Sequence, residues 1–558
     1  MKDIYVIGLE FGTDSARALL VNAITGKEID TEVAYYSRWM EGKYSVTSIA
    51  QFRHHPKDYL EALQQCIRKV TERHPELTDD IVSISLDTTA STPCLVDKEC
   101  TPLALKEEFK DNPDAMFVVW KDHTGQPEAD EINKLIAEQK INYSLHTGNF
   151  YSAENFWCKV LHTLRHSPEL QKEAYSAIEI CDYIPALLTG CKNPSEVKMG
   201  HCCAASKLMW AEEWEGYPPA EFFKQFDPIL LPILEHLPKD NYSCETSVGT
   251  LTAEWAGKLG LREGITIGTG NVDSHSGGVG GGINYGTMVM NLGTSACFMS
   301  VMPKEEMGDT VVEGIFGQVE GSILSNMIGF ESGLSSFGDD FAWFKNLMTW
   351  PIKTIINNNS SLNEKTKQEL IAEAEDNILI HAAQEAEKLD ITINSPLATD
   401  WFNGRRAPYS NNALTATISG LNLATTAAEI YYAIAEATAF ATKCCIDHNA
   451  KYGVVTEKLI GIGGIAQKSP FVVQLLADAI NMPIEVSDCK QAGTLGSVIH
   501  AAVAAHIYPT VADAQKVLCK PASRQYLPNK QRHELLKRRF ERYKSLGFFT
   551  EQEQQKNY

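Results

Sequence analysis

The chain has 558 residues, of which 44% are hydrophobic and 22% are charged, as expected of a globular protein. Its formal net charge of −21 disfavours a broad surface for nucleic acid or for an anionic membrane, because phosphates need basic partners. A chain of this length exceeds the size at which a single hydrophobic core usually stops growing, so we expect two large domains.

Targeting signals are the next class to exclude. The N-terminus enters an apolar run at Tyr5 without the charged region and long hydrophobic segment of a secretory signal. No uninterrupted apolar stretch of about 18 residues follows, which argues against a membrane span. We therefore expect a cytoplasmic protein. These patterns do not decide its oligomeric state, and a homodimer is compatible with them.

Two distant segments, Tyr5 to Val21 and Thr287 to Val301, share one pattern. Each has an apolar strand, a turn that contains Gly-Thr, and a second apolar strand. This repetition predicts a duplicated domain with a ligand held between the halves. We place the boundary in the polar stretch 261–264, which gives domains of residues 1–262 and 263–558.

Strand-like and helix-like stretches alternate between and after these hairpins, which predicts an α/β fold. We expect helices over residues 58–73, 364–388, 429–446, 470–480 and 530–546, and strands over 81–86, 265–268 and 458–464. The last helix is basic and amphipathic, and we interpret it as a docked terminal helix. A helix rich in small residues, beginning near Gln491, suits an interdomain hinge.

The turns of the two hairpins carry the residues that could bind phosphate: Gly12, Thr13, Asp14 and Ser15 in the first, and Gly293, Thr294 and Ser295 in the second. Backbone N–H groups and hydroxyls in such turns can point toward a phosphate. One turn of this kind is most simply a tight hairpin, whereas two facing turns can clamp a triphosphate. Glu10, just before the first turn, could hold Mg²⁺ through water.

A third glycine cluster, which includes Gly463 and Gly464, lies between a predicted strand and a predicted helix, and Gln467 follows it. Glycines there allow a flat ligand to approach the backbone closely. The spacing does not match the dinucleotide-binding G-x-G-x-x-G pattern, and the Walker pattern is absent. Both a Rossmann domain and a P-loop kinase are therefore disfavoured.

Taken together, the two turns, the late glycine cluster and the segment from Gly270 to Gly277 resemble the FGGY carbohydrate kinases, a branch of the sugar kinase, chaperone and actin superfamily. The resemblance implies two ribonuclease-H-like domains with an interdomain active-site cleft. It also implies ATP and Mg²⁺ as cosubstrate and cofactor, with adenosine near Gly463, Gly464 and Gln467. Asp273 would be the catalytic base and would reach the metal through water.

Stretches at 51–56, 86–93, 112–117, 120–124, 330–333 and 400–406 are similar to the family members that phosphorylate L-ribulose in L-arabinose catabolism. That similarity implies a ketopentose site formed by Ala90, Trp120, Asp122, Lys207, Asp273 and Glu331. Another pentulose or polyol kinase, such as a xylulokinase, is the alternative within the family. A chaperone or filament is a third interpretation, and sugar-dependent ADP release would exclude it.

Several residues keep a plain structural interpretation. Lys207 could be a surface lysine and Glu331 an ordinary loop carboxylate, while Arg405 and Arg406 could bind phosphate or form ion pairs. The first turn also departs from the family pattern, because Glu10 stands where the family usually has Asp. The longer side chain affects the detailed metal geometry rather than the class of activity.

Overall fold

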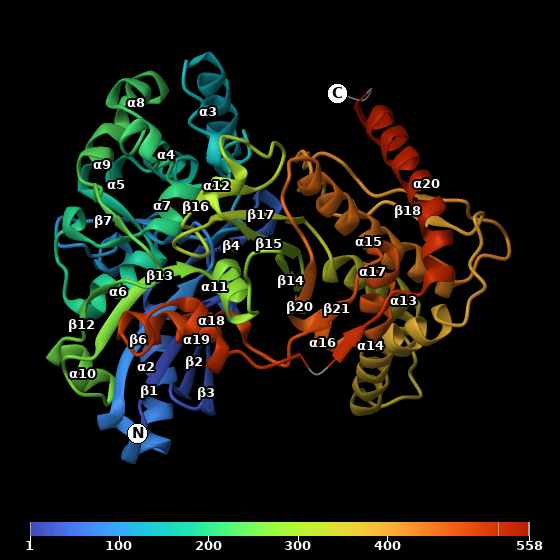
Figure 1. The fold of residues 1–558 in the computed structure, drawn as a ribbon, viewed down its shortest axis with the longest axis horizontal. Coiled ribbons are helices and arrows are strands. Elements are labelled where there is room, and N and C mark those ends of the chain that lie inside the picture. The colour runs from blue at the N-terminus through green and yellow to red at the C-terminus, as the bar shows by residue number, and fades with distance from the viewer. Residues whose placement is uncertain (1, 523, 556–558) are drawn as a thin grey trace.

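The computed structural model describes residues 2–522 and 524–555, and it contains two large sheets that lie beside each other (Figure 1). The first sheet has the strand order β12-β13-β6-β1-β2-β3. Its strands are β1 (Tyr5–Phe11), β2 (Ser15–Asn22), β3 (Glu28–Tyr35), β6 (Ile81–Thr88), β12 (Ser247–Thr250) and β13 (Thr266–Val272). Strand β1 pairs antiparallel with β2 and parallel with β6, and β6 pairs parallel with β13.

The second sheet has the order β16-β17-β15-β14-β20-β21-β22. Its strands are β14 (Thr287–Leu292), β15 (Ala296–Met302), β16 (Gly317–Glu320), β17 (Ile328–Leu334), β20 (Lys458–Ile462), β21 (Ile484–Val486) and β22 (Arg524–Tyr526). Strand β14 pairs antiparallel with β15 and parallel with β20, so its hairpin occupies the same place as β1 and β2 in the first sheet. The predicted pair of equivalent hairpins is confirmed.

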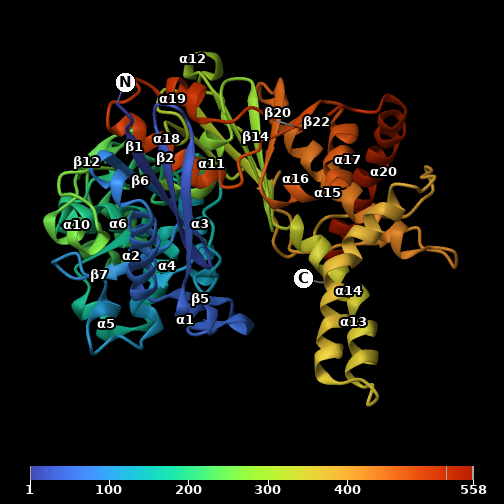
Figure 2. The same cartoon turned by 90° about the horizontal axis from the view of Figure 1, so that it is seen from below.

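Helices cover both sheets. Around the first sheet lie α2 (Pro56–Arg73), α3 (Gln126–Glu138), α4 (Phe156–His166), α6 (Ile180–Thr189), α7 (His201–Lys207), α10 (Ala253–Leu259) and α11 (Asp273–Gly280). The second sheet is accompanied by α13 (Gly338–Asn357), α14 (Glu364–Ala386), α15 (Ala427–Lys451), α17 (Pro470–Ile480) and α20 (Lys530–Gln555). Figure 2 shows α13 and α14 projecting from the body as a helical hairpin. The helices expected from periodicity all form.

Strand β13 follows the boundary that we expected at residues 262 and 263, yet it belongs to the first sheet. Its hydrogen bonds to β6 set this place, because Ile267 pairs with Ile84 and Val272 with Thr88. The chain passes to the second sheet only after α11, through β14. Asp273, the first residue of α11, therefore lies at the end of a strand of the first sheet.

Two late helices, α18 (Ala492–Ala504) and α19 (Val511–Leu518), return to the first sheet, where Figure 1 shows them beside the N-terminal strands. Small residues allow close packing there: an added Cβ at Gly8 would lie 2.3 Å from the Thr494 carbonyl oxygen, and one at Gly496 would lie 1.9 Å from the Ser276 carbonyl oxygen. Helix α18 thus packs closely against both β1 and α11, as its small residues predicted.

No helix within the described residues is long and apolar enough to cross a membrane.

The C-terminal helix α20 docks through a buried ion pair rather than by apolar contact alone. The Arg539 guanidinium donates to both carboxylate oxygens of Glu436 on α15, at 2.5 and 2.6 Å, and it also reaches the carbonyl oxygen of Pro396 at 2.7 Å. Both charged side chains are almost fully buried. This pairing confirms the expected docked terminal helix.

Replacing Arg539 with Ala should lower stability by about 3–5 kcal/mol, because it leaves the Glu436 carboxylate buried without its counter-charge. Thermal and urea unfolding monitored by circular dichroism would measure the change. Arg538→Ala removes a neighbouring exposed arginine of the same helix and serves as the matched control. Equal unfolding midpoints for the two variants would contradict the importance of the pair.

Candidate active site

A row of polar side chains lies at the carboxyl ends of three adjacent parallel strands. Glu10 of β1 pairs in register with Asp87 of β6, and Asp87 pairs with Asn271 of β13. Residues in register on neighbouring parallel strands point to the same face of the sheet, so the two carboxylates lie side by side. Asp273 follows two residues after Asn271. Binding sites of open α/β sheets commonly lie at this edge.

The N-terminal turn of α18 faces this row of carboxylates. Thr494 donates its hydroxyl to Glu10 Oε2 at 2.7 Å, and Ser497 donates to Asp87 Oδ2 at 2.6 Å. An added Cβ at Gly493 would lie 3.3 Å from Glu10 Oε2 and 3.6 Å from Asp87 Oδ1, so both carboxylates approach the helix backbone. Arg17 of β2 forms an ion pair with Glu10 Oε1 at 3.1 Å.

Crowding of like charges changes the acidity of these groups. Burial, and then the nearby Glu10 carboxylate, raise the pKa of Asp273 to about 7. The same two causes raise the pKa of Asp87 well above its usual range. Asp87 Oδ1 is buried and has no hydrogen-bond partner among the described residues. Arg17 is paired with Glu10, so this oxygen of Asp87 is left available to a bound cation.

Asp273 is the first residue of α11, and its Oδ1 accepts a hydrogen bond from the backbone N–H of Ser274 at 2.6 Å. This contact fixes one carboxylate oxygen at the start of the helix. Along the chain, Asp273 stands between Asn271, which is in register with Asp87, and His275, whose Nε2 lies 3.2 Å from Glu331 Oε2 on the second sheet.

A backbone hydrogen bond from the glycine closes each predicted phosphate turn, and the first turn is one residue longer than the second. In the first, the Gly12 N–H donates to the Ser15 carbonyl at 2.9 Å, and in the second the Gly293 N–H donates to the Ser295 carbonyl at 3.0 Å. Thr13 Oγ1 accepts a hydrogen bond from the Trp120 indole at 3.1 Å. The second turn instead receives the N–H groups that begin α13, because those of Phe337 and Asp339 donate to the Thr294 carbonyl.

The late glycine cluster lies where β20 leads into the short helix α16 (Gly464–Lys468). Gly463 has φ +89°, and an added Cβ would come within 2.7 Å of Asn291 Oδ1, so this position requires glycine. Nothing lies within 4 Å of a Cβ built on Gly464, which leaves its backbone open. Gln467 differs from the expectation: its amide binds the Ser487 carbonyl and the Arg524 guanidinium, so it ties α16 to β21 and β22.

A second charged group lies across from the carboxylate row. Lys207, at the end of α7, is 4% exposed. Its ammonium lies 5.3 Å from the centre of the Phe316 ring, and the Arg406 guanidinium lies 4.0 Å from the same ring. Burial opposes the charge of Glu331 on β17, but Lys207, His275 and Arg406 hold the pKa of its carboxyl well below the usual range. Lys207, Arg406 and Glu331 thus form one buried cluster.

His275, on the first turn of α11 beyond Asp273, connects the two charged groups. Its Nε2 lies 3.2 Å from Glu331 Oε2, and its Nδ1 lies 3.2 Å from the Ser322 carbonyl and 2.9 Å from Cys202 Sγ. Burial opposes protonation, yet the Cys202 sulfur and the Glu331 carboxylate raise the pKa of His275 to about 10. A doubly protonated ring satisfies acceptors on both sides and orients Glu331.

Ala90 and Trp120 belong to two loops that one buried lysine joins. The Lys159 ammonium, from α4, donates to the carbonyl oxygens of Ser91, Val119 and Trp120. Ser91 in turn donates to Glu179 at 2.9 Å. Lys159 therefore sets the relative position of the Ala90 loop and of the Trp120 indole that contacts the first phosphate turn.

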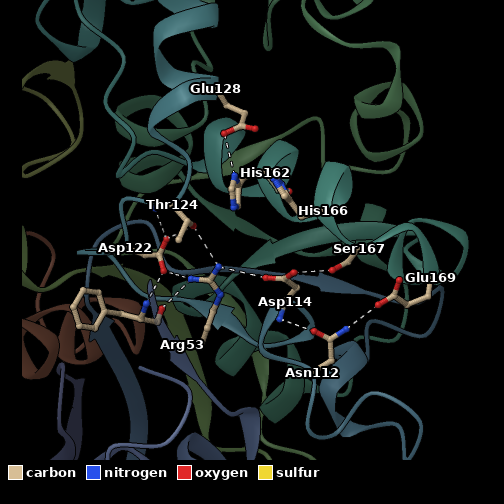
Figure 3. A network of polar contacts seen from close by, with 11 residues as sticks. Arg53, Asn112, Asp114, Asp122, Thr124, Glu128, His162, His166, Ser167 and Glu169 are labelled. Carbon is tan, nitrogen blue, oxygen red and sulfur yellow. Dashed lines mark hydrogen bonds and ion pairs between the residues drawn. The ribbon is translucent and has the colours of Figure 1, made fainter. Parts of the chain in front are cut away.

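Asp122 belongs to the same loop as Trp120, and Figure 3 shows its carboxylate facing Arg53 and Thr124. It is fully buried, and its oxygens accept hydrogen bonds from the Arg53 guanidinium, the Phe52 N–H and the Thr124 hydroxyl. We had expected it at the sugar, but these protein donors occupy both oxygens. Its geometry is that of a support for the 120–124 loop, because it fixes the backbone two residues after Trp120.

A cavity of about 390 Å³ opens beside the Lys207 and Arg406 cluster. Residues 147–155 of the N-terminal half form one wall, and Phe316 and Tyr409 lie in the other. Its lining contains none of the charged side chains of the site, and it adjoins Lys207 and Arg406 only through the Phe316 ring. The charged residues thus lie at the border between the two halves.

Two residues of the site were not singled out from the sequence. Asp87 could have been found, because a carboxylate directly after a buried strand is a signal for the edge of a parallel sheet. His275 carried no such signal, since only the tertiary packing of α11 brings its side chain to Glu331 on β17.

The chain is similar to known proteins over nearly its whole length. Residues 5–280 match the N-terminal domain of the FGGY family of carbohydrate kinases, and residues 288–505 match its C-terminal domain. A ribulokinase of Vibrio parahaemolyticus is 42% identical over 98% of this chain and 96% of its own length. A ribulokinase of Bacillus licheniformis is 33% identical over 95% of this chain and 94% of its own.

Among solved structures, a xylulose kinase from Rhodospirillum rubrum superposes with a TM-score of 0.76 at 16% identity, over 99% of this chain and 100% of its own. A glycerol kinase from Plasmodium falciparum with ADP gives a TM-score of 0.73 at 16% identity, with 97% of each chain covered. These likenesses confirm the expected fold of two ribonuclease-H-like domains. By both family profiles and near full-length similarity, the chain belongs to the FGGY family of carbohydrate kinases.

Proposed function

We propose that this protein transfers the γ-phosphoryl group of ATP to the 5-hydroxyl of L-ribulose, as a cytoplasmic step of L-arabinose catabolism. The products are L-ribulose 5-phosphate and ADP. One observation carries the proposal: Asp273 lies between a row of carboxylates suited to a metal–nucleotide and a buried cluster suited to a polyhydroxylated ligand. The curated relatives named ribulokinase support ribulose as the acceptor. A xylulokinase activity is supported by likeness of fold alone.

The carboxylate row fits Mg²⁺. Asp87 Oδ1 is buried without a partner, and Glu10 and Asp273 act electrostatically on the same site. Oxygen ligands of this kind, partly through water, suit Mg²⁺. When bound, the ion would neutralise charge that develops on the phosphates. The methylene that Glu10 adds relative to Asp is accommodated beside Gly493, where no side chain intervenes.

The chain's own residues would position the reacting groups. The turns at Gly12 and Gly293 would offer backbone N–H groups to the phosphates, and the open backbone at Gly464 would admit the adenosine. Asp273 would accept the proton of the 5-hydroxyl while that oxygen forms a bond to Pγ and the bond from Pγ to the ADP oxygen breaks. Lys207, buried on the opposite side, would stabilise negative charge on the transferred group.

The sugar would lie between Glu331, Lys207 and the Ala90 loop. A charged carboxylate such as Glu331 accepts hydrogen bonds from sugar hydroxyls, and His275 holds it in one orientation. Closure of the two halves would exclude water, so that the sugar rather than water receives the phosphoryl group.

The direct test is a coupled assay of ADP release with L-ribulose, D-ribulose, D-xylulose and L-xylulose. We expect the highest kcat/KM for L-ribulose and little ATP hydrolysis without sugar. A higher kcat/KM for D-xylulose than for L-ribulose would contradict the assigned substrate but not the kinase activity. ATP hydrolysis that does not depend on any sugar would contradict both.

Asp273→Asn should lower kcat by roughly 10²–10⁴-fold, because an amide cannot accept the proton of the attacking hydroxyl. Binding of ADP, measured by calorimetry, should remain. Asp309→Asn changes an exposed aspartate in the same way and is the control for the substitution itself. Turnover of Asp273→Asn close to that of the control would rule out the assigned base.

Glu331→Gln should reduce kcat/KM for the sugar by roughly 10- to 100-fold, since charged hydrogen bonds contribute about 1.5–3 kcal/mol. The KM for ATP should change little, because the hydrogen-bond partners of the Glu331 carboxylate among the described residues are His275 and Cys297, and neither belongs to a phosphate turn. Steady-state kinetics with the sugar and ATP varied in turn would separate the effect on the sugar from the effect on ATP. The assignment fails if the KM for ATP rises while that for the sugar stays constant.

A further inference from the structure

A group of possible metal ligands lies outside the active site, between helices α3 and α4. Glu128 comes from the first turn of α3, and His162 and His166 come from α4 (Figure 3). One ligand atom from each of the three side chains lies within 4.8 Å of the other two. None of these residues takes part in the phosphoryl transfer described above.

Helical geometry explains why the histidines converge. Residues four apart lie on the same face of a helix, one above the other. The two imidazole rings accordingly lie with centroids 4.0 Å apart and planes inclined by 30°. Packing of α3 against α4 brings the Glu128 carboxylate over this pair. Three ligands on two helices thus need only small side-chain movements to meet one ion.

The hydrogen bonds leave suitable lone pairs. His166 Nδ1 donates to the His162 carbonyl oxygen at 2.8 Å, which leaves its Nε2 as a free lone pair. His162 Nδ1 lies 3.1 Å from Glu128 Oε2. Two ligand atoms on a tetrahedral zinc ion lie about 3.3 Å apart, given bonds of about 2.0–2.1 Å. An ion can therefore replace the shared proton between His162 and Glu128 with little change in their separation.

The electrostatic surroundings also suit a cation. The Glu128 side chain is almost fully buried, and its Oε2 faces His162 Nδ1 at 3.1 Å. Arg165 lies 3.5 Å from Oε1, the oxygen that does not face His162. Its own charge is balanced by Glu131 and Asp227, each at 2.9 Å. The arginine therefore occupies one carboxylate oxygen and leaves the other for an ion.

We propose that Glu128, His162 and His166 bind one divalent transition-metal ion of the Zn²⁺ or Co²⁺ type. Two imidazole nitrogens and one carboxylate oxygen favour such an ion over Mg²⁺ or Ca²⁺, which prefer oxygen ligands. His166 is exposed, so water can complete the coordination. The ion would join α3 to α4 and stabilise the folded chain, since it binds a site that the unfolded chain lacks.

The structure also indicates where such a link would act. Helix α3 begins two residues after Thr124, at the end of the loop that carries Trp120. The Gln126 N–H donates to the His123 carbonyl and joins that loop to the helix. An ion that links α3 to α4 would restrain the 120–124 loop without contacting the substrate. Helix α4 also carries Lys159, which binds backbone carbonyls of the same region.

Co²⁺ is the probe for the test, because its visible absorption reports the ligands. Equilibrium dialysis and absorption spectra of the full chain would be recorded without nucleotide and with excess Mg²⁺, which keeps the carboxylate row filled. His166→Ala removes the exposed ligand, and His162→Ala removes the second. His381→Ala removes an exposed histidine of α14 and is the matched control.

We expect the wild type and His381→Ala to bind one Co²⁺ with weak visible bands of nitrogen and oxygen ligands. Both histidine variants of the site should bind at least ~10-fold more weakly. Co²⁺ should raise the melting temperature of the wild type and the control but not of His166→Ala. Equal Co²⁺ affinity in His166→Ala and His381→Ala would overturn the site. So would a spectrum dominated by thiolate charge transfer.

Discussion

The architecture depends on bringing like charges together at the carboxyl ends of parallel strands. Register places Glu10 beside Asp87, and α11 starts with Asp273 close by. Burial, and then repulsion from Glu10, raise the pKa of Asp273 and of Asp87, so their charged forms are costly here. Hydroxyls of Thr494 and Ser497 and the charge of Arg17 offset part of this cost. In the function that we propose, a bound Mg²⁺ and its nucleotide would offset the remainder.

Helix α18 makes this arrangement tolerable. This helix comes from the late part of the chain and packs on the first sheet. Glycines at 8, 280 and 496 allow a close approach, so the Thr494 and Ser497 hydroxyls reach the carboxylates of Glu10 and Asp87. One hydrophobic cluster contains residues of β1, β14, β15 and α18, so the same packing holds the two sheets together. Stability and site geometry therefore share one set of contacts.

The opposite side of the site uses complementary charge. Lys207 and Arg406 flank Phe316 and keep Glu331 ionised, while His275 orients it. These residues come from both halves of the chain, so the proposed sugar side is complete only when the halves meet. Farther out, Lys159, the Arg53–Asp122 pair and the α3–α4 contact hold the 120–124 loop. The positions of the site residues thus depend on several buried polar contacts around the site.

The sequence by itself determined the two equivalent hairpins, the principal helices and the family, because local periodicity and turn chemistry depend on consecutive residues. It also predicted Asp273 as the base. Only the tertiary structure placed β13 in the first sheet, since strand pairing depends on distant partners. The tertiary structure also shows that Asp122 and Gln467 bind protein groups, and it adds Asp87 and His275 to the candidate site. Register between strands and the return of α18 bring together residues far apart in the chain, which no local pattern encodes.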